Sequence, residues 1–158
     1  MIARKMQFVT DSGDQSIITQ AVFDDRYQDA SDPLYPSTAI LYGQILYSQG
    51  VKNQIGYIHF ERENFAGADA YILAVQGRAG EGAPFKNLFA AYRDENTSAT
   101  SDNDFTWNGE DIEAAIDGAN RDGLLSLGFP LMPQMRIIIS TYNDAAGGDL
   151  SLEFWMIS

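Results

Sequence analysis

Apolar and polar residues alternate, or β-branched and aromatic residues gather, in eight short runs along the chain. Both patterns are typical of strands, because successive side chains of a strand point to opposite faces of a sheet. Turn-forming residues, mostly Gly, Asp, Asn and Pro, separate the runs. We therefore predict strands at residues 2–10, 16–23, 38–48, 54–61, 70–76, 85–92, 135–142 and 150–157.

The face pattern of two of these runs predicts where they lie in the sheet. Both faces of residues 38–48 are largely apolar, which indicates a central strand covered on two sides. Residues 135–142 and 150–157 flank a loop rich in Asp and Gly, and we predict that they form a hairpin. In the second of these strands, Leu150, Leu152, Phe154 and Met156 form one apolar face, while Ser151, Glu153, Trp155 and Ile157 form the other. Either a second sheet or another subunit would cover that second face.

Residues 109–118 carry the one helical pattern in the chain. Asn108 can act as the N-cap, acidic residues occupy the first turns, Ile112 and Ile116 share a face, and Gly118 suits the end of a helix. The pattern predicts a short surface helix near residues 110–117. The preceding segment, 94–104, is acidic and almost free of apolar residues, which predicts an exposed loop.

These elements together predict the fold class. A chain of 158 residues falls in the size range of one domain, and its 45% hydrophobic content is enough for one core. We predict a single all-β domain over residues 1–158, an antiparallel β-sandwich or jelly roll of about eight strands with one short helix.

Composition excludes several classes of function. The chain has no cysteine, which rules out disulfides, thiolate metal sites and thiol nucleophiles. Its net charge of -12 disfavours direct binding to nucleic acid. No apolar run is long enough for a transmembrane helix, and the first residues do not form a signal peptide, so we expect synthesis in the cytoplasm and no membrane association.

Candidate catalytic groups are few. His59 is the only histidine and has no nucleophile motif to serve, so we interpret it as a structural or surface residue. Glu61 and Glu63 lie two apart in a predicted strand and could act as a carboxylate pair in a hydrolase, but they flank Arg62 at a strand end, which favours a solvated edge. The glycine-rich residues 77–84 lack the lysine of a phosphate-binding loop and predict a flexible loop.

A partial calcium-binding pattern runs from Asp104 to Gly109. Oxygen-bearing side chains occupy its first, third and fifth positions, but Ala115 stands where a calcium loop needs its glutamate. Asp102 and Asp111 could complete an irregular site with Asp104 and Asn108. Calcium is thus the only cofactor for which the sequence offers candidate ligands.

Tyrosine and tryptophan residues are the main candidates for a binding surface, because each combines apolar area with a polar group. The interface candidates are Tyr92, Trp107, Trp155 and Ile157. One functional reading, a carbohydrate-binding or adhesion module, would use Trp107, Tyr92 and the acidic loop, with or without calcium. A hydrolase that uses a carboxylate pair is a further functional interpretation.

The whole chain resembles small virion proteins of tailed bacteriophages, in particular the β-sandwich or jelly-roll proteins that decorate or cement capsids. The features that carry the resemblance are Met1, the absence of cysteine, the acidic β-rich composition, the loops rich in Asn, Asp and Gly, and the strand at 150–157. The resemblance implies a non-enzymatic structural protein located in the virion. It also implies an oligomer, with a trimer as the first expectation, in contact with a capsid or tail protein.

Overall fold

The computed structural model describes residues 2–29, 31–47, 55–63, 70–93, 103–107, 110–114, 121–127, 131–143 and 147–157. Within these residues the chain forms twelve strands and one helix. The elements are β1 (Ile2–Lys5), β2 (Ile17–Ile18), α1 (Gln20–Asp24), β3 (Leu41–Tyr42), β4 (Leu46–Tyr47), β5 (Ile55–Glu63), β6 (Ala70–Arg78), β7 (Lys86–Arg93), β8 (Asn103–Trp107), β9 (Glu110–Ala114), β10 (Arg121–Leu127), β11 (Gln134–Asn143) and β12 (Asp149–Ile157).

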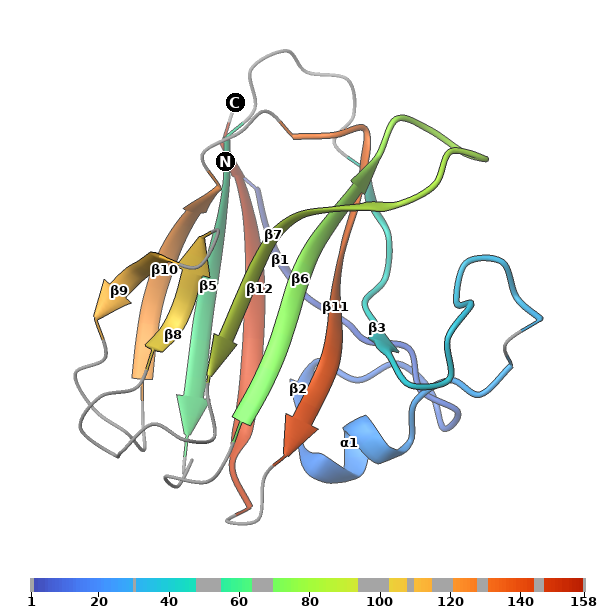
Figure 1. The fold of residues 1–158 in the computed structure, drawn as a ribbon, viewed down its shortest axis with the longest axis horizontal. Coiled ribbons are helices and arrows are strands. Elements are labelled where there is room, and N and C mark those ends of the chain that lie inside the picture. The colour runs from blue at the N-terminus through green and yellow to red at the C-terminus, as the bar shows by residue number, and fades with distance from the viewer. Residues whose placement is uncertain are drawn as a thin grey trace.

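The strands form an antiparallel β-sandwich, which confirms the predicted fold class. One sheet has the order β1-β12-β5-β10, and β2 extends its edge by pairing with β12. The other sheet has the order β3-β11-β6-β7, and β4 likewise pairs with β11. Figure 1 shows the second sheet in front of the first. A separate pair, β8-β9, contacts β7 through β8.

Successive strands mostly alternate between the two sheets. β5 and β6 lie in different sheets, as do β10 and β11, while β6 and β7 form a hairpin within one sheet. Without the short strands β2 and β4, the two sheets contain eight strands, and their order is the connectivity of a jelly roll. The β8-β9 pair is inserted in the connection from β7 to β10.

The predicted hairpin of residues 135–142 and 150–157 is wrong. Both strands exist, but β11 pairs with β3, β4 and β6, whereas β12 pairs with β1, β2 and β5. The connection between them therefore crosses from one sheet to the other. A strand-loop-strand pattern is the same for a hairpin and for such a crossing, because both need only a polar, glycine-containing loop between two strands.

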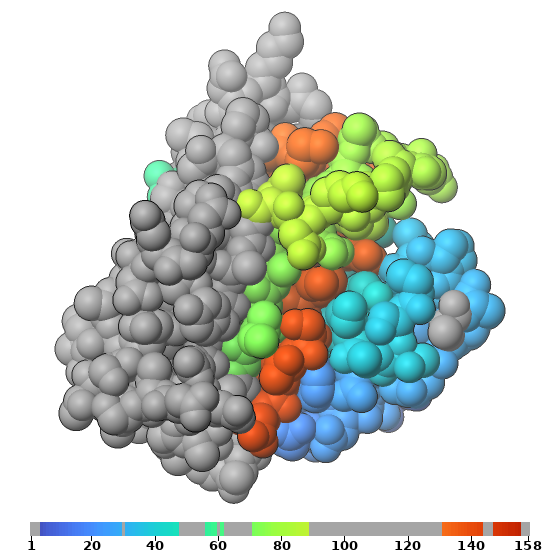
Figure 2. Space-filling view, viewed as in Figure 1, coloured from blue at the N-terminus to red at the C-terminus, as the bar shows by residue number. Residues whose placement is uncertain are grey.

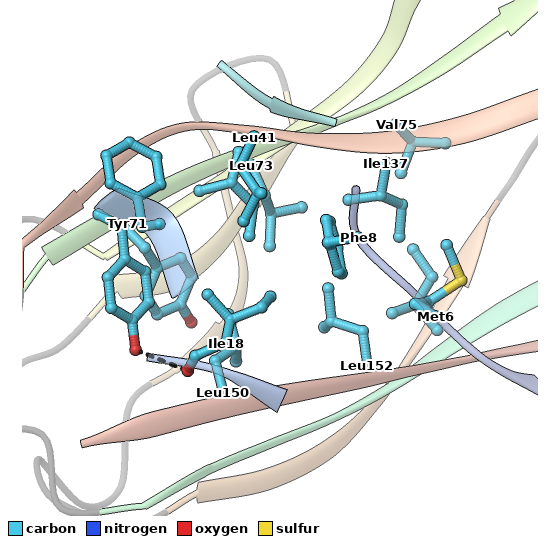
Figure 3. Packing of buried hydrophobic residues seen from close by; sticks show 14 of the residues in the cluster. Met6, Phe8, Ile18, Leu41, Tyr71, Leu73, Val75, Ile137, Leu150 and Leu152 are labelled. Atoms are coloured by element: carbon cyan, nitrogen blue, oxygen red, sulfur yellow. Dashed lines mark hydrogen bonds between the residues drawn. The ribbon is translucent and has the colours of Figure 1, made fainter. Parts of the chain in front are cut away.

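The core lies between the sheets. Figure 3 shows Leu73, Val75 and Ile137 pointing from one sheet toward Leu150 and Leu152 of the other. Phe8 and Met6 come from the segment after β1, and each is at most 1% exposed. On β12 the alternation predicted from sequence is confirmed for Leu150, Leu152 and Phe154, which are all buried in this core.

A hydrogen-bonded corner joins the sheets near Gly43. The Gly43 amide donates to the carbonyl of Ile137 on β11, with an N···O distance of 2.8 Å, and Gly43 also forms a bridge with Phe8. Here the predicted strand at 38–48 breaks into β3 and β4, which lie at the edge of their sheet instead of its centre. Both faces of β3 are nevertheless buried, because Leu41 enters the core and Tyr42 packs on the outer side of the sheet.

The helix predicted near residues 110–117 is also wrong. Residues 110–114 form β9, which pairs with β8, and Asn108 and residues 115–117 lie outside the described residues. So short a helix gains little from its capping residues and needs packing to be stable, whereas pairing with β8 satisfies the backbone directly. The start of β8 at Asn103 overlaps the predicted loop at 94–104, and β10 was not predicted.

The described helix, α1, lies within the predicted strand at 16–23. Thr19 caps it by accepting a hydrogen bond from the Val22 amide, with a donor-acceptor distance of 3.3 Å. Phe23 is the buried residue of the helix and packs against Tyr142 of β11, with ring centroids 6.0 Å apart. Only Ile17 and Ile18 remain as a strand in this segment, as β2.

Candidate functional site

An aromatic pair lies on the outer face of the β1-β12-β5-β10 sheet. Leu152 and Phe154 of β12 point into the core, so the alternation of the strand directs Trp155 to the opposite face. The register places Trp155 opposite Tyr57 of β5, and both side chains are half-buried. The face of Trp155 is therefore turned away from the β3-β11-β6-β7 sheet, which packs on the opposite side of β12.

His59 and Glu153 lie beside this pair on the same face. They are opposite one another in the β5-β12 register, and His59 Nδ1 is 3.0 Å from Glu153 Oε1. Lys5 of β1 is opposite Glu153 on its other side, and Glu61 of β5 is exposed. His59 thus forms a partly exposed surface pair, in keeping with the structural or surface role inferred from the sequence.

The structure places the other predicted interface residues on strands. Ile157 is at the end of β12, Tyr92 is on β7 opposite Ile72, and Trp107 ends β8 opposite Glu110. Tyr92 and Trp107 belong to the neighbouring strands β7 and β8, whereas Trp155 belongs to a strand of the other sheet.

The calcium candidates fall on and around the β8-β9 pair. Asp104 is on β8, Asp111 is on β9 opposite Thr106, and Asp102 and Asn108 lie outside the described residues. The backbone here is a pair of antiparallel strands, not the helix-flanked loop of a typical calcium site. Among the described residues, no group of three or more His, Asp or Glu side chains is arranged to hold a metal ion. Calcium binding at these residues stays a prediction.

A second cluster, which the sequence analysis did not single out, lies on the outer face of the β3-β11-β6-β7 sheet. Arg78 ends β6, and Arg136 lies on β11 between two core residues, so both arginines point away from the core. Their guanidinium carbons are 4.5 Å and 3.9 Å from the centroid of the Phe85 ring. Arg136 also lies 4.7 Å from the centroid of the Tyr42 ring. Cation-π contacts of this kind stabilise cations that are removed from water.

Hydrogen bonds fix both guanidinium groups. Arg136 donates from Nε to Gln76 Oε1 at 2.9 Å and from Nη1 to the carbonyl oxygen of Leu34 at 2.6 Å. Arg78 donates from Nε to Gln134 Oε1 at 2.7 Å. Neither arginine forms an ion pair with a carboxylate in the described part of the chain. Burial lowers the pKa of Arg136 from its ordinary value, yet an arginine stays protonated at neutral pH.

The segment that Arg136 holds at Leu34 is a turn. Asp32, Pro33, Leu34 and Tyr35 form it: the Tyr35 amide donates to the Asp32 carbonyl at 3.0 Å, and the Leu34 amide donates to Asp32 Oδ1 at 3.0 Å. Tyr35 packs on Tyr42 with ring centroids 5.5 Å apart. Burial raises the pKa of Tyr35, and the charge of Asp32 raises it further.

Between this turn and the tip of the β6-β7 hairpin lies a groove of about 660 Å³. Figure 2 shows it as the hollow between the yellow-green hairpin tip and the blue segment around residue 35. Its lining includes one cation, two acids, an amide and apolar side chains. The lining residues are Asp32, Pro33, Leu34, Ile45, Tyr47, Arg78, Glu81, Gly82, Ala83, Pro84 and Gln134.

The glycine-rich segment 77–84 supplies one wall of this groove. Gly77 and Arg78 are still part of β6, and residues 79–84 form the turn of the hairpin. Gly82 has a positive φ of 84°, which favours glycine.

In the sequence, Arg136 is the one indication that a site lies nearby, because it is a charged residue inside the apolar run from Met135 to Ile139.

Comparison of the chain with protein-family models, with curated proteins and with solved structures gives no match. In the part of the chain that the structure describes, no helix has the length and apolar character needed to cross a membrane.

Proposed function

We propose that the chain is a non-enzymatic structural protein of a bacteriophage particle, where it decorates or stabilises the capsid, or another part of the particle, through protein-protein contacts. The jelly-roll order of its strands supports this role, because capsid proteins are a major class built on that fold. Lectins and cupins use the same fold, so the fold alone does not decide the function. A surface feature has to carry the proposal.

That feature is the outward-facing pair of Tyr57 and Trp155. Aromatic side chains are enriched at protein interfaces, and tryptophan and tyrosine are among the residues that contribute most of the binding energy there. The pair lies on neighbouring strands within the sheet, β5 and β12, so the strand ladders hold it in place. A rigid sheet face that presents two large aromatics is a suitable contact surface for another subunit, and we take self-association into a symmetric oligomer, with a trimer first, as its use.

The first experiment measures self-association. Native mass spectrometry of the purified chain at a series of concentrations should give one closed oligomer, and Trp155→Ala should shift it to monomers. A contact residue at the centre of an interface contributes about 2 kcal/mol or more, which corresponds to a roughly thirtyfold weaker association. Tyr47→Ala is the matched control, because Tyr47 is 53% exposed and lies on the other sheet. A monomer at all concentrations, or equal effects of the two substitutions, would contradict the proposed contact.

The second experiment tests the location. Quantitative mass spectrometry of gradient-purified phage particles that encode the chain should find it in a copy number set by the particle's symmetry. Its absence from such particles, together with its presence in the lysate, would refute the virion role regardless of the oligomeric state.

A further inference from the structure

We propose that the groove between the 32–35 turn and the β6-β7 hairpin binds an acidic sugar, whose carboxylate pairs with the guanidinium of Arg78. The site lies on the β3-β11-β6-β7 sheet, while the aromatic pair proposed for subunit contact lies on the other sheet. The inference therefore goes beyond the structural role and does not depend on it.

The strongest observation is the state of Arg78. Its side chain is 9% exposed, its Nε donates to Gln134, and its guanidinium stacks on Phe85. Its Nη groups form no hydrogen bond with any described residue, although Arg78 lines the groove. An arginine has five N–H donors, and the Nη groups of Arg78 are not among the fully buried polar atoms of the described residues, so they face the open groove. A carboxylate in the groove would accept two parallel hydrogen bonds from this planar group.

The groove is rigid around Arg78. Arg136 acts as a positioning residue. It donates a hydrogen bond to the Leu34 carbonyl, and it stacks on the ring of Phe85, on which Arg78 also stacks. The turn and the hairpin tip are thereby held against one sheet. A preorganised donor loses less entropy on binding than a mobile one. The volume of about 660 Å³ lies within the range of about 300–1,000 Å³ that small-molecule sites occupy.

The remaining lining fits a sugar ring. Tyr47 is 53% exposed and, with Pro33 and Pro84, offers apolar surface on which the C–H face of a ring can pack. Asp32 and Glu81 are acceptors for sugar hydroxyls. Donors and acceptors around an aromatic side chain match a molecule that carries many hydroxyl groups and one carboxylate.

The two acids also discriminate among anions. A phosphate carries up to two negative charges, and Asp32 and Glu81 would repel it while Arg78 alone attracted it. An acidic peptide would bring several carboxylates toward a protein whose net charge is -12. An acidic sugar has a single carboxylate, which the one guanidinium of Arg78 can pair with. The hydroxyl groups of the sugar can donate hydrogen bonds to Asp32 and Glu81.

Isothermal titration calorimetry tests the proposal with named probes: galacturonate and N-acetylneuraminate as acidic sugars, and their methyl esters as neutral counterparts. At least one acid should bind about tenfold more tightly than its ester, because the ester cannot pair with Arg78 in the same way. Added sodium chloride should weaken the binding of the acid more than that of the ester.

Three variants locate the site. Arg78→Lys keeps the charge but loses the planar pair of donors, and it should weaken binding of the acid about tenfold or more. Tyr47→Ala removes an exposed side chain, so the fold should persist while affinity for both acid and ester falls. Arg4→Gln is the matched control, because Arg4 is exposed on β1 in the other sheet, and it should leave binding unchanged. Circular dichroism of each variant verifies the fold.

The following results would overturn the proposal. One is equal affinity for acid and ester, and another is the absence of binding by every probe. A third is a loss with Arg4→Gln as large as the loss with Arg78→Lys. Tighter, Arg78-dependent binding of a short polyglutamate would assign the groove to acidic peptides and not to sugars. If Arg78→Lys failed to fold, Tyr47→Ala alone would decide, since a folded variant with unchanged affinity places the sugar elsewhere.

Discussion

Gly43 should tolerate no side chain, because it stands where the two sheets meet. A Cβ at this position would lie 2.6 Å from the carbonyl oxygen of Ile137. Ordinary contacts between a carbon and a carbonyl oxygen are about 3.3–3.6 Å, so β11 and the Gly43 segment would have to move apart by roughly 0.7–1 Å. The Gly43 amide donates to that same oxygen at 2.8 Å, and a shift of this size would stretch the hydrogen bond beyond its normal range.

The expected cost of Gly43→Ala follows from these two effects. A buried amide that loses its acceptor costs about 1–3 kcal/mol, and forced displacement in a packed interior costs about 1–3 kcal/mol more. Alanine restricts the unfolded chain relative to glycine, which returns about 0.4–1 kcal/mol. We therefore expect the free energy of unfolding to fall by about 1–5.5 kcal/mol.

Urea denaturation followed by circular dichroism measures this change, with an unchanged m-value as the sign of two-state unfolding. Gly80→Ala is the matched control, since a Cβ there would meet no atom within 4 Å and its φ is not positive. It should be neutral or stabilising by up to about 1 kcal/mol. If Gly43→Ala were within about 0.5 kcal/mol of Gly80→Ala, the reasoning about the corner would be refuted.

Two further substitutions test the core and a surface carboxylate. Leu152→Ala removes a fully buried side chain from a central strand and should lower the free energy of unfolding by about 2–5 kcal/mol in the same urea assay. Ile72→Ala, at a position 42% exposed, should lower it by less than about 1 kcal/mol. Equal costs would contradict the assignment of Leu152 to the core face and of Ile72 to the outer face. Hydrogen bonds from Ser12 lower the pKa of Asp25 in the folded chain. The charged carboxylate of Asp25 therefore stabilises the fold above the pKa of about 3.8 that Asp25 has in the unfolded chain. This contribution is lost as the pH falls through the lower pKa of the folded chain. Below pH 4, the free energy of unfolding should therefore change less steeply with pH in Asp25→Asn than in the unsubstituted chain. If the two plots of free energy of unfolding against pH superimpose, Asp25 makes no such contribution.

Strand faces could be predicted from the sequence because they depend on local alternation. Leu150, Leu152 and Phe154 were assigned to one apolar face, and all three are buried. Pairing could not be predicted in the same way. β11 and β12 are adjacent in the chain but lie in different sheets, and their partners are set by contacts with distant strands. The local preference of residues 110–114 for a helix was likewise outweighed by pairing with β8.

The groove could not be predicted because its parts come from four separate segments. The turn at Asp32, strand β4, and the ends of β6 and β11 meet only in the folded chain. Arg78 belonged to a glycine-rich segment that predicted a flexible loop, and nothing in its neighbours indicates that Phe85 and Gln134 would fix it. Of the interface candidates singled out in advance, Trp155 is the one whose side chain the structure places, and it lies on the same outer sheet face as His59.

The crossing from β11 to β12 has a consequence for the order of folding. β12 lies between β1 and β5, and β11 lies between β3 and β6, so each of these four earlier strands has one edge whose neighbour is made only near the end of the described chain. Contacts at such long sequence separation give a high relative contact order, and proteins of this kind fold in milliseconds to seconds. Until then β1, β3, β5 and β6 expose open strand edges, and the nascent chain is most vulnerable to aggregation just before β11 and β12 emerge from the ribosome.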